Sequence, residues 1–339
     1  MMTSKIENAP KISCIVTVHN EGKLAAVSLR SLMAQSFTDF EILVVDDGAS
    51  ETTRAVVRSF DDPRIQHIQQ ANDGPSSARN RALSNARGEY VCFLDADDTR
   101  PPWAFAEMVA ATENSPDCVF SPGTLIGLRK EILPFYDQTI FERLKAFGYT
   151  ALSVGDKAFI EALRLLTCVE PQSANKLVKR SFLDKHQIRF PNGVSFFEDS
   201  NFHLLILMNM SSFKIMDLPT FTYFRRYGEK RLTDSRSYLR FDAFAAVINV
   251  MQYFEKSRYF QDHKCRFLLT AVTFRVLQWG LESVSLDLRY TYEQALKLIV
   301  THMDDRLLRP VPEAEWAELE YYAPWVKPSL QFLQGFKRP

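Results

Sequence analysis

The first hundred residues of the chain alternate short apolar runs with segments of helical periodicity. The apolar runs predict buried strands, and the segments between them place apolar residues at helical spacing. Strands that alternate with helices are typical of an α/β protein with a mostly parallel sheet between two helical layers. The predicted strands are residues 12–18, 41–45, 64–69 and 90–94, and the predicted helices are residues 24–34, 53–60 and 76–86.

Acidic side chains directly follow the second and fourth predicted strands: Asp46, Asp47, Asp95, Asp97 and Asp98. In an open α/β sheet the carboxyl ends of parallel strands meet at one edge, and ligands bind there. Carboxylates packed so closely repel each other unless a cation lies among them, and oxygen ligands select hard cations such as Mg²⁺ or Mn²⁺. We therefore expect a cation site that serves a diphosphate. A solvated acidic turn is the alternative for each cluster taken alone.

Two other nucleotide-binding folds have a similar sheet but require a glycine-rich loop after the first strand. A Rossmann domain needs G-x-G-x-x-G there, and a nucleotidyltransferase needs a glycine-rich, basic phosphate loop. Residues 17–22 read Thr-Val-His-Asn-Glu-Gly, which fits neither pattern, and the sequence contains no Walker loop. Both alternatives are therefore disfavoured.

The composition, 46% hydrophobic and 24% charged, is that of an ordinary globular protein. Lys+Arg and Asp+Glu are both 41, so no net charge attracts the chain to nucleic acid. The five cysteines are odd in number and lack C-x-x-C spacing, which indicates a reducing compartment. No apolar run reaches the ~18 residues of a membrane span, and we see no signal peptide. We expect a cytoplasmic protein.

The strand–helix alternation stops near Tyr238. Three segments with apolar helical stripes follow, at residues 243–254, 267–281 and 292–303. We expect an α/β domain over residues 1–235 and a C-terminal helical region over residues 236–339. Trp, Tyr and Phe are frequent in residues 316–336, where they either pack as core or rest on a membrane surface.

The middle of the chain carries weaker patterns. Residues 117–128 predict two strands, and residues 129–170 a helical insertion. Residues 173–185 predict a basic helix with Lys176 and Lys179 on its solvated face.

Several stretches, in this order and at this spacing, resemble the family 2 inverting glycosyltransferases of the GT-A fold. They are Ile15–Glu21, Ser31–Phe37, Ile42–Ser50, Gly74–Leu83, Phe93–Asp98 and Glu198–Asp199. The resemblance covers residues 11–235 and implies the GT-A nucleotide-diphospho-sugar transferase fold with a divalent cation. The chain departs from the family pattern at Ala49, where Ser or Thr is usual, and we expect little effect.

The resemblance implies roles for particular residues. Thr17 and Asp47 hold the nucleotide base, with Asp47 accepting a hydrogen bond from a uracil ring. Arg79 lies beside the base and phosphates. Asp95 contacts the ribose or the metal, and Asp97 ligates Mg²⁺ or Mn²⁺ on the diphosphate.

The same resemblance places Asn20, Glu21, Asp46 and Ala96 in nucleotide-sugar-binding segments. From the residues alone, Asp46 is better explained as a turn or cap residue.

A second acidic pair supplies the expected catalytic groups. By resemblance, Asp199 occupies the position of the catalytic base, with Glu198 beside it. An N-cap of the following apolar helix is the alternative for Asp199. His203, one turn further on, is either structural or a site residue. Arg225 and Arg226 either clamp the diphosphate or are exposed.

These expectations combine into a metal-dependent inverting glycosyltransferase with a nucleotide-sugar donor, above all a UDP-sugar. The acceptor is a glycan or a lipid-linked glycan in bacterial surface polysaccharide biosynthesis, with peripheral contact at the inner face of the membrane. A non-catalytic nucleotide-sugar-binding protein is the alternative. The presence of both Asp97 and Asp199 disfavours it, because a degenerate site usually loses one of them.

Overall fold

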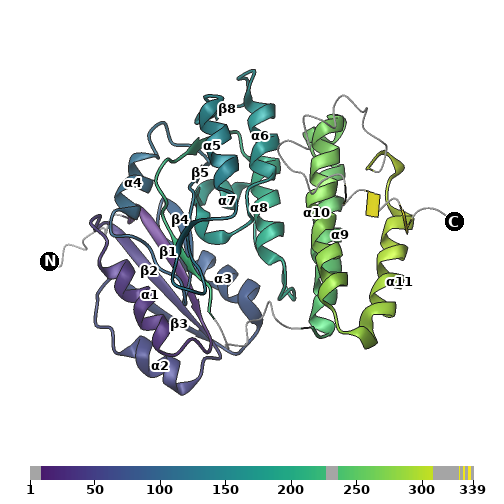
Figure 1. Ribbon diagram of the computed structural model, residues 1–339. Coiled ribbons are helices and arrows are strands. Elements are labelled where there is room, and N and C mark those ends of the chain that lie inside the picture. Colours follow the sequence, from purple (N-terminus) through teal and green to yellow (C-terminus); the bar gives the residue numbers. More distant parts are fainter. Residues whose placement is uncertain (1–8, 227–235, 308–327, 329–330, 333–334, 337–339) are drawn as a thin grey trace. The chain divides into compact units, whose positions relative to one another are not determined.

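The computed structural model describes residues 9–226, 236–307, 328, 331–332 and 335–336 (Figure 1). The chain forms two compact units that interleave along the sequence. The first unit contains the described residues up to Phe135, then Ser173–Arg189 and Ser211–Arg225. The second contains Tyr136–Gln172, Phe190–Met210 and the described residues from Arg226 onward. A single cut at residue 235, which we expected from the sequence, therefore does not separate these units.

The first unit is built around a mixed, mostly parallel sheet with the strand order β3-β2-β1-β4-β9-β5-β10. Strands β1, β2, β3 and β4 run parallel, and β9 pairs antiparallel with both β4 and β5. The strands are β1 (Ile12–Val18), β2 (Phe40–Asp47), β3 (Ile65–Gln70), β4 (Tyr90–Asp95), β5 (Cys118–Phe120), β9 (Lys176–Lys179) and β10 (Ser212–Ile215). The helices are α1 (Lys23–Met33), α2 (Glu51–Arg58), α3 (Gly74–Asn85), α4 (Ala104–Ala110) and α7 (Arg180–Lys185). The alternation predicted for residues 12–95 is confirmed.

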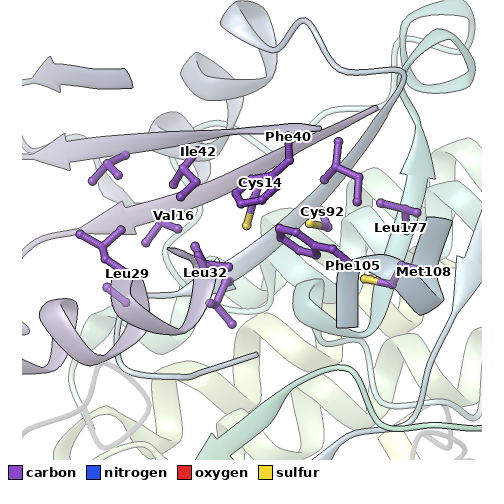
Figure 2. Close-up of a cluster of buried hydrophobic side chains, with 14 of the residues drawn as sticks. Cys14, Val16, Leu29, Leu32, Phe40, Ile42, Cys92, Phe105, Met108 and Leu177 are labelled. Carbon is purple, nitrogen blue, oxygen red and sulfur yellow. The ribbon is translucent and has the colours of Figure 1, made fainter. Parts of the chain in front are cut away.

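The core of this unit lies between β1, β2 and β4 on one side and α1 and α4 on the other (Figure 2). Leu29 and Leu32 of α1 and Phe105 and Met108 of α4 are fully buried there. These residues recur at helical spacing and so line one face of each helix, while alternate residues of the strands point at them. Burial of such apolar side chains fixes the strand register, and the register fixes which residues end each strand.

A second, three-stranded sheet has the order β11-β6-β7. Its strands are β6 (Thr124–Ile126), β7 (Ile132–Pro134) and β11 (Thr222–Phe224). Two strands were predicted within residues 117–128, and they exist as β5 and β6. They belong to different sheets, however, and residues 121–123 between them are in neither strand.

The predicted basic helix over residues 173–185 is wrong. The segment forms a 3₁₀ turn (Ser173–Asn175), strand β9 and the short helix α7. Leu177 and Val178 are fully buried because β9 lies inside the sheet between β4 and β5. Lys176 is also fully buried rather than solvated, and its Nζ donates to Asn175 Oδ1 at 2.6 Å.

The second unit is mainly helical. It contains α5 (Gln138–Ala146), α6 (Phe159–Thr167), α8 (Glu198–Asn209), α9 (Asp242–Glu255), α10 (His263–Ser283) and α11 (Leu286–His302). It also contains the short strand β8 (Ala151–Ser153) and the 3₁₀ turns at Tyr238–Phe241, Arg258–Gln261 and Asp305–Leu307. Helix α9 packs against α8 and α10, and α10 packs against α6 and α11. The three predicted C-terminal helices are confirmed as α9, α10 and α11.

Among the described residues, no helix combines the length and apolar character that crossing a bilayer requires. The aromatic tail at 316–336 lies largely outside the described residues.

Candidate functional site

The carboxyl ends of β1, β2 and β4 meet at one edge of the sheet in the first unit. In the strand register, Thr17 pairs with Val45 on one side and with Asp95 on the other. Thr17 and Asp95 are half-buried. The ends of these three strands and the segments that follow them therefore bring Thr17, Asp47, Asp95 and Asp97 to one edge of the sheet.

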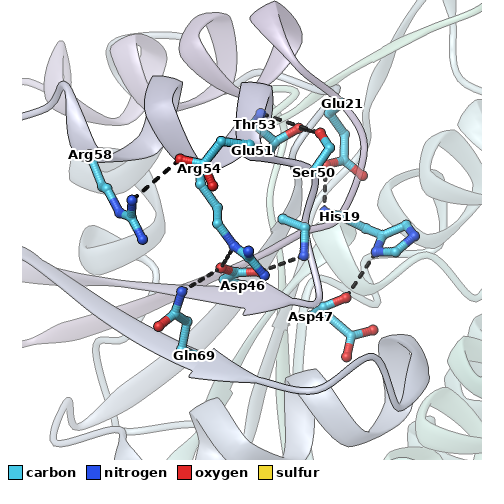
Figure 3. A network of polar contacts seen from close by, with 11 residues as sticks. His19, Glu21, Asp46, Asp47, Ser50, Glu51, Thr53, Arg54, Arg58 and Gln69 are labelled. Atoms are coloured by element: carbon cyan, nitrogen blue, oxygen red, sulfur yellow. Dashed lines mark hydrogen bonds and ion pairs between the residues drawn. The ribbon is translucent and has the colours of Figure 1, made fainter.

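Asp46 and Asp47 point to opposite sides of β2, since successive side chains of a strand alternate. Asp46 turns toward α2 (Figure 3). Its carboxylate accepts from Ala49 N at 2.6 Å, Arg54 Nε at 2.7 Å and Gln69 Nε2 at 3.0 Å. Burial on its own raises the pKa of Asp46, but these hydrogen bonds outweigh it and hold the pKa below its usual value. Asp46 thus ties the end of β2 to α2 and β3.

Asp47 organises the loop that leads into α3. Its carboxylate accepts from Gln70 Nε2 at 2.9 Å, from Asp73 N at 2.8 Å and from Gly74 N at 3.0 Å. An ionised carboxylate offers about four lone-pair positions. The three donors therefore leave Asp47 the capacity for one further N–H donor.

The loop between β1 and α1 is fixed by its own side chains. His19 N donates to Glu21 Oε2 at 2.7 Å, and His19 Nδ1 lies 2.8 Å from the carbonyl oxygen of Asp47. The Nδ1–H tautomer is needed to donate that bond. Asn20, between them, is exposed.

Glu21 lies within electrostatic reach of Asp97. Burial raises the pKa of Glu21 above its usual value, the bond from His19 N opposes this rise, and the negative charge of Asp97 adds to it. Two acidic groups from different loops therefore share this part of the edge.

Arg79 of α3 places a positive charge at the end of β4. The side chain is 6% exposed, and its Nη2 donates to Asp95 Oδ1 at 3.0 Å. The Asp95 side chain remains 36% exposed. Ala96, the next residue, is buried in the apolar core.

The turn after β4 separates Asp97 from Asp98. Asp98 is 1% exposed, and its Oδ1 accepts from Phe224 N at 3.2 Å, so it serves to fix β11. Asp97 is half-buried. Of the three carboxylates that the sequence groups here, Asp95 and Asp97 therefore lie at the edge, and Asp98 has a structural role.

The side chains at this edge provide only some of the oxygen ligands that a hard cation needs. Across the described residues, no group of three or more His, Cys, Asp or Glu side chains is arranged to hold a metal. Mg²⁺, however, is usually held by one or two carboxylates together with substrate phosphate oxygens. Asp95 and Asp97 fit that requirement, since both lie at the carboxyl end of β4 and neither side chain is fully buried.

Arg100 was not singled out from the sequence. It is 2% exposed, and its guanidinium donates to the carbonyl oxygens of Phe93, Ala174 and Thr220 at 2.8–3.0 Å. These bonds join β4 to two distant segments of the first unit. The only signal in the sequence is that Arg100 lies two residues after the acidic residue Asp98.

In the second unit, Glu198 and Asp199 begin α8. Glu198 is 8% exposed and Asp199 is half-buried. The residue before the helix is Phe197, which adopts the left-handed conformation with φ 66° and offers no capping side chain. Asp199 is therefore inside the first turn and is not the N-cap. A helix N-terminus favours negative charge in this position.

His203 is 1% exposed, and its Nε2 lies 3.2 Å from the carbonyl oxygen of Leu166. This contact anchors α8 to α6, so a structural role of His203 is favoured.

Of the two arginines that follow β11, Arg225 is exposed and Arg226 is half-buried.

The sheet order and the positions of the strand ends define the first unit as an α/β domain of the GT-A type. Residues 13–153 match the family model described as "Glycosyl transferase family 2", and this part of the chain belongs to that family.

A solved structure is similar to this chain in its fold. A crystal structure of S. aureus TarS 1–349 in complex with UDP-GlcNAc matches 96% of this chain and 92% of that chain, with a TM-score of 0.71 and 21% identity. This likeness confirms the predicted fold, a mixed and mostly parallel sheet followed by C-terminal helices.

Two curated relatives match shorter stretches. The succinoglycan biosynthesis protein ExoO of Rhizobium meliloti is 27% identical over 57% of this chain and 55% of its own length. A GalNAc(5)-diNAcBac-PP-undecaprenol beta-1,3-glucosyltransferase of Campylobacter jejuni is 41% identical over 26% of this chain and 30% of its own. The chain spans less than two thirds of the length of these relatives.

Proposed function

We propose that the protein is an inverting glycosyltransferase that moves a sugar from a nucleotide-diphospho-sugar, above all a UDP-sugar, to a hydroxyl group of a glycan or lipid-linked acceptor. One observation carries this proposal: Thr17, Asp47, Arg79, Asp95 and Asp97 lie at one sheet edge in a domain of glycosyl transferase family 2. The UDP-GlcNAc in the similar TarS structure and the undecaprenol-linked acceptor in the name of the Campylobacter relative support the substrate classes.

The donor is bound by groups at the ends of β1, β2 and β4 and on α3. Asp47 accepts the N–H of a uracil ring at its remaining acceptor position, and Thr17, near the end of the neighbouring strand β1, also contacts the base. Arg79 holds Asp95 and offers positive charge near the diphosphate, while Asp95 contacts the ribose or the metal. Asn20, Glu21 and Ala96 shape the loops around the donor, and Asp46 acts indirectly through the turn that presents Asp47.

Asp97, together with Asp95, would hold Mg²⁺ or Mn²⁺ on the diphosphate. Such a cation neutralises the charge that develops on the departing nucleoside diphosphate. Glu21 adds negative charge nearby and favours cation binding at the same place.

Asp199 acts as the catalytic base, with Glu198 beside it. In a single displacement at the anomeric carbon, the acceptor oxygen forms the new glycosidic bond as the bond to the diphosphate oxygen breaks. The acceptor hydroxyl proton passes to the carboxylate of Asp199, and the nucleoside diphosphate leaves with the electron pair. The anomeric configuration is inverted because there is only one displacement.

Thermal melting with UDP, GDP, CDP and dTDP, each with Mn²⁺ or with EDTA, tests the donor site. A ligand that binds only the folded state stabilises it by about 2.7 kcal/mol at a hundred times its dissociation constant. We expect a shift with UDP that requires Mn²⁺. Absence of a shift with every nucleotide contradicts the proposal.

Turnover separates an enzyme from a non-catalytic binding protein. We expect release of UDP from a UDP-sugar panel, either slowly by hydrolysis or faster with acceptor. A metal-dependent UDP shift without any UDP release would favour the binding protein. Flotation with anionic vesicles tests whether the protein acts at a membrane surface.

A further inference from the structure

Three consecutive residues before the Glu198–Asp199 pair are each held by the C-terminal helical elements of the second unit. Ser195 N donates to Asp242 Oδ2 at 2.8 Å. The Phe196 ring lies 4.7 Å from the guanidinium carbon of Arg240. The Phe197 ring meets the Trp279 ring edge-on, with centroids 5.1 Å apart.

Phe197 has the least favourable backbone conformation in this segment. Its φ of 66° is unusual for an aromatic residue, whose side chain is crowded in the left-handed region. Such conformations persist only where the surroundings enforce them, and they cluster at functional sites. The next residue is Glu198, so the direction in which α8 starts depends on this conformation.

Arg240 stacks between the rings of Phe196 and Trp279, and the Trp279 ring also meets Phe197 edge-on. The Arg240 guanidinium carbon lies 4.7 Å from the Phe196 ring and 4.5 Å from the Trp279 ring, and the residue is only 2% exposed. A guanidinium between two aromatic faces is held by their negative π surfaces. The Trp279 ring thus contacts both Arg240 and Phe197.

The other side of the carboxylate pair is also anchored. Asn201 is 1% exposed, and its Nδ2 donates to the carbonyl oxygen of Ala246 and to Asn249 Oδ1, both at 3.2 Å. Both acceptors belong to α9. The first turn of α8 is therefore fixed before and after Glu198 and Asp199.

We propose that Arg240 and Trp279 are positioning residues for the acidic pair, so that the 3₁₀ turn at Tyr238–Phe241, α9 and α10 contribute to catalysis. The inference rests on the proposed function of Asp199. It gives residues 236–283 a chemical role: they hold the backbone that aims the base at the acceptor hydroxyl group.

Kinetics of paired variants test this role. Trp279→Ala and Arg240→Met remove the stack, whereas Trp279→Phe keeps an aromatic face. We expect kcat to fall about 10²-fold in the first two, since a small misplacement of a reacting group has an effect of that order. KM for the donor should stay within about twofold, as for the loss of an interaction that acts mainly in the transition state. Trp279→Phe should recover most of the activity.

Two further variants distinguish an effect on positioning from a loss of folding. Phe197→Gly removes the ring but adopts positive φ without strain, so it should remain folded and still lose kcat. Tyr290→Ala removes a 71% exposed aromatic ring from α11 of the same unit, and it should leave both kcat and KM unchanged.

Hydrogen exchange gives a readout that does not depend on turnover. Amides of residues 195–201 should exchange faster in Trp279→Ala than in the native protein, while the rest of α8 stays protected. Unchanged exchange at these amides, or unchanged kcat in an active enzyme, overturns the inference. Absence of turnover in the native protein, together with faster exchange in the variant, counts against the proposed function instead.

Discussion

Asp199 and Glu198 are adjacent carboxylates in the first turn of α8, where the free amide groups of the helix stabilise negative charge. They differ in exposure: Glu198 is 8% exposed, whereas Asp199 is half-buried. A group that takes a proton from an acceptor must be reachable by it. This difference favours Asp199 as the base and Glu198 as its support.

Asp199→Asn should separate binding from chemistry. The amide cannot take the acceptor proton, so we expect kcat to fall about 10²–10⁴-fold, the usual contribution of a general base. The melting shift with UDP and Mn²⁺ should persist, because every proposed donor ligand belongs to the first unit. Glu198→Gln is the matched variant and should lose less. Normal turnover in Asp199→Asn would exclude it as the base.

The N-terminus of α10 depends on one carboxylate with two functions. Asp262 Oδ1 accepts from Cys265 N at 2.8 Å and so caps the helix. Both of its oxygens also accept from Arg164 Nη2, at 3.1 and 2.9 Å, and Arg164 is paired with Glu161 as well. Burial raises the pKa of Asp262, but the bonds from Cys265 N and Arg164 outweigh it and hold the pKa below its usual value.

Asp262→Ala should lower the free energy of unfolding by about 1–3 kcal/mol, since it removes the cap and a charged partner of Arg164. Asp262→Asn keeps a capping oxygen and should lose less. Because the folded pKa is depressed, the contribution of the charge is present above the unfolded pKa of about 3.9 and is lost as pH falls through the folded value.

Urea unfolding at pH 7 and at pH 3 measures this effect. The difference between native protein and Asp262→Asn should shrink at pH 3, and a difference that is independent of pH would contradict the assignment. Glu293→Gln on α11 is the control, because Glu293 forms an exposed pair with Arg289 and should change stability little.

Helices and strands were predicted correctly where the apolar pattern of the sequence agrees with the burial of its residues in the structure. Strands β1, β2 and β4 are continuous apolar runs, and the helices between them have one apolar face, so residues 12–95 were correctly predicted. Residues 173–185 were predicted wrongly, because Lys176 and Lys179 suggested a solvated helix. The segment forms a strand instead, because Leu177 and Val178 are buried inside the sheet. Tertiary burial overrides local propensity in such a segment.

In the whole molecule, some functional contacts join residues that are far apart in the sequence, and the sequence alone does not predict these contacts. Asp95, Asp97 and Arg79 lie close in sequence, so their grouping at one edge was predictable. The stack beside Glu198 joins residues 196, 240 and 279, and no local pattern links positions so far apart. The position of Asp98 was also unpredictable, since its partner, Phe224, lies 126 residues away.

The interleaved units predict that truncation after residue 235 does not leave a stable protein. In the second unit, α8 packs against α9 and α6 packs against α10, and residues 201–208 of α8 are all buried. Removing α9 and α10 exposes these apolar surfaces to water at about 25 cal/mol per Å². We expect the truncated protein to aggregate or to lose helix content, as measured by size-exclusion chromatography and circular dichroism.

Single substitutions in the full chain test whether the stability of the second unit depends on the buried face of α9. Val250→Asp places a charge at a 2% exposed position of α9, and Ile248→Asp places one at a 41% exposed position of the same helix. The first should destabilise the second unit strongly, because an unpaired charge is buried, and the second should be close to neutral. A soluble, monomeric 1–235 protein that keeps α6 and α8 would show instead that the predicted boundary separates independent domains.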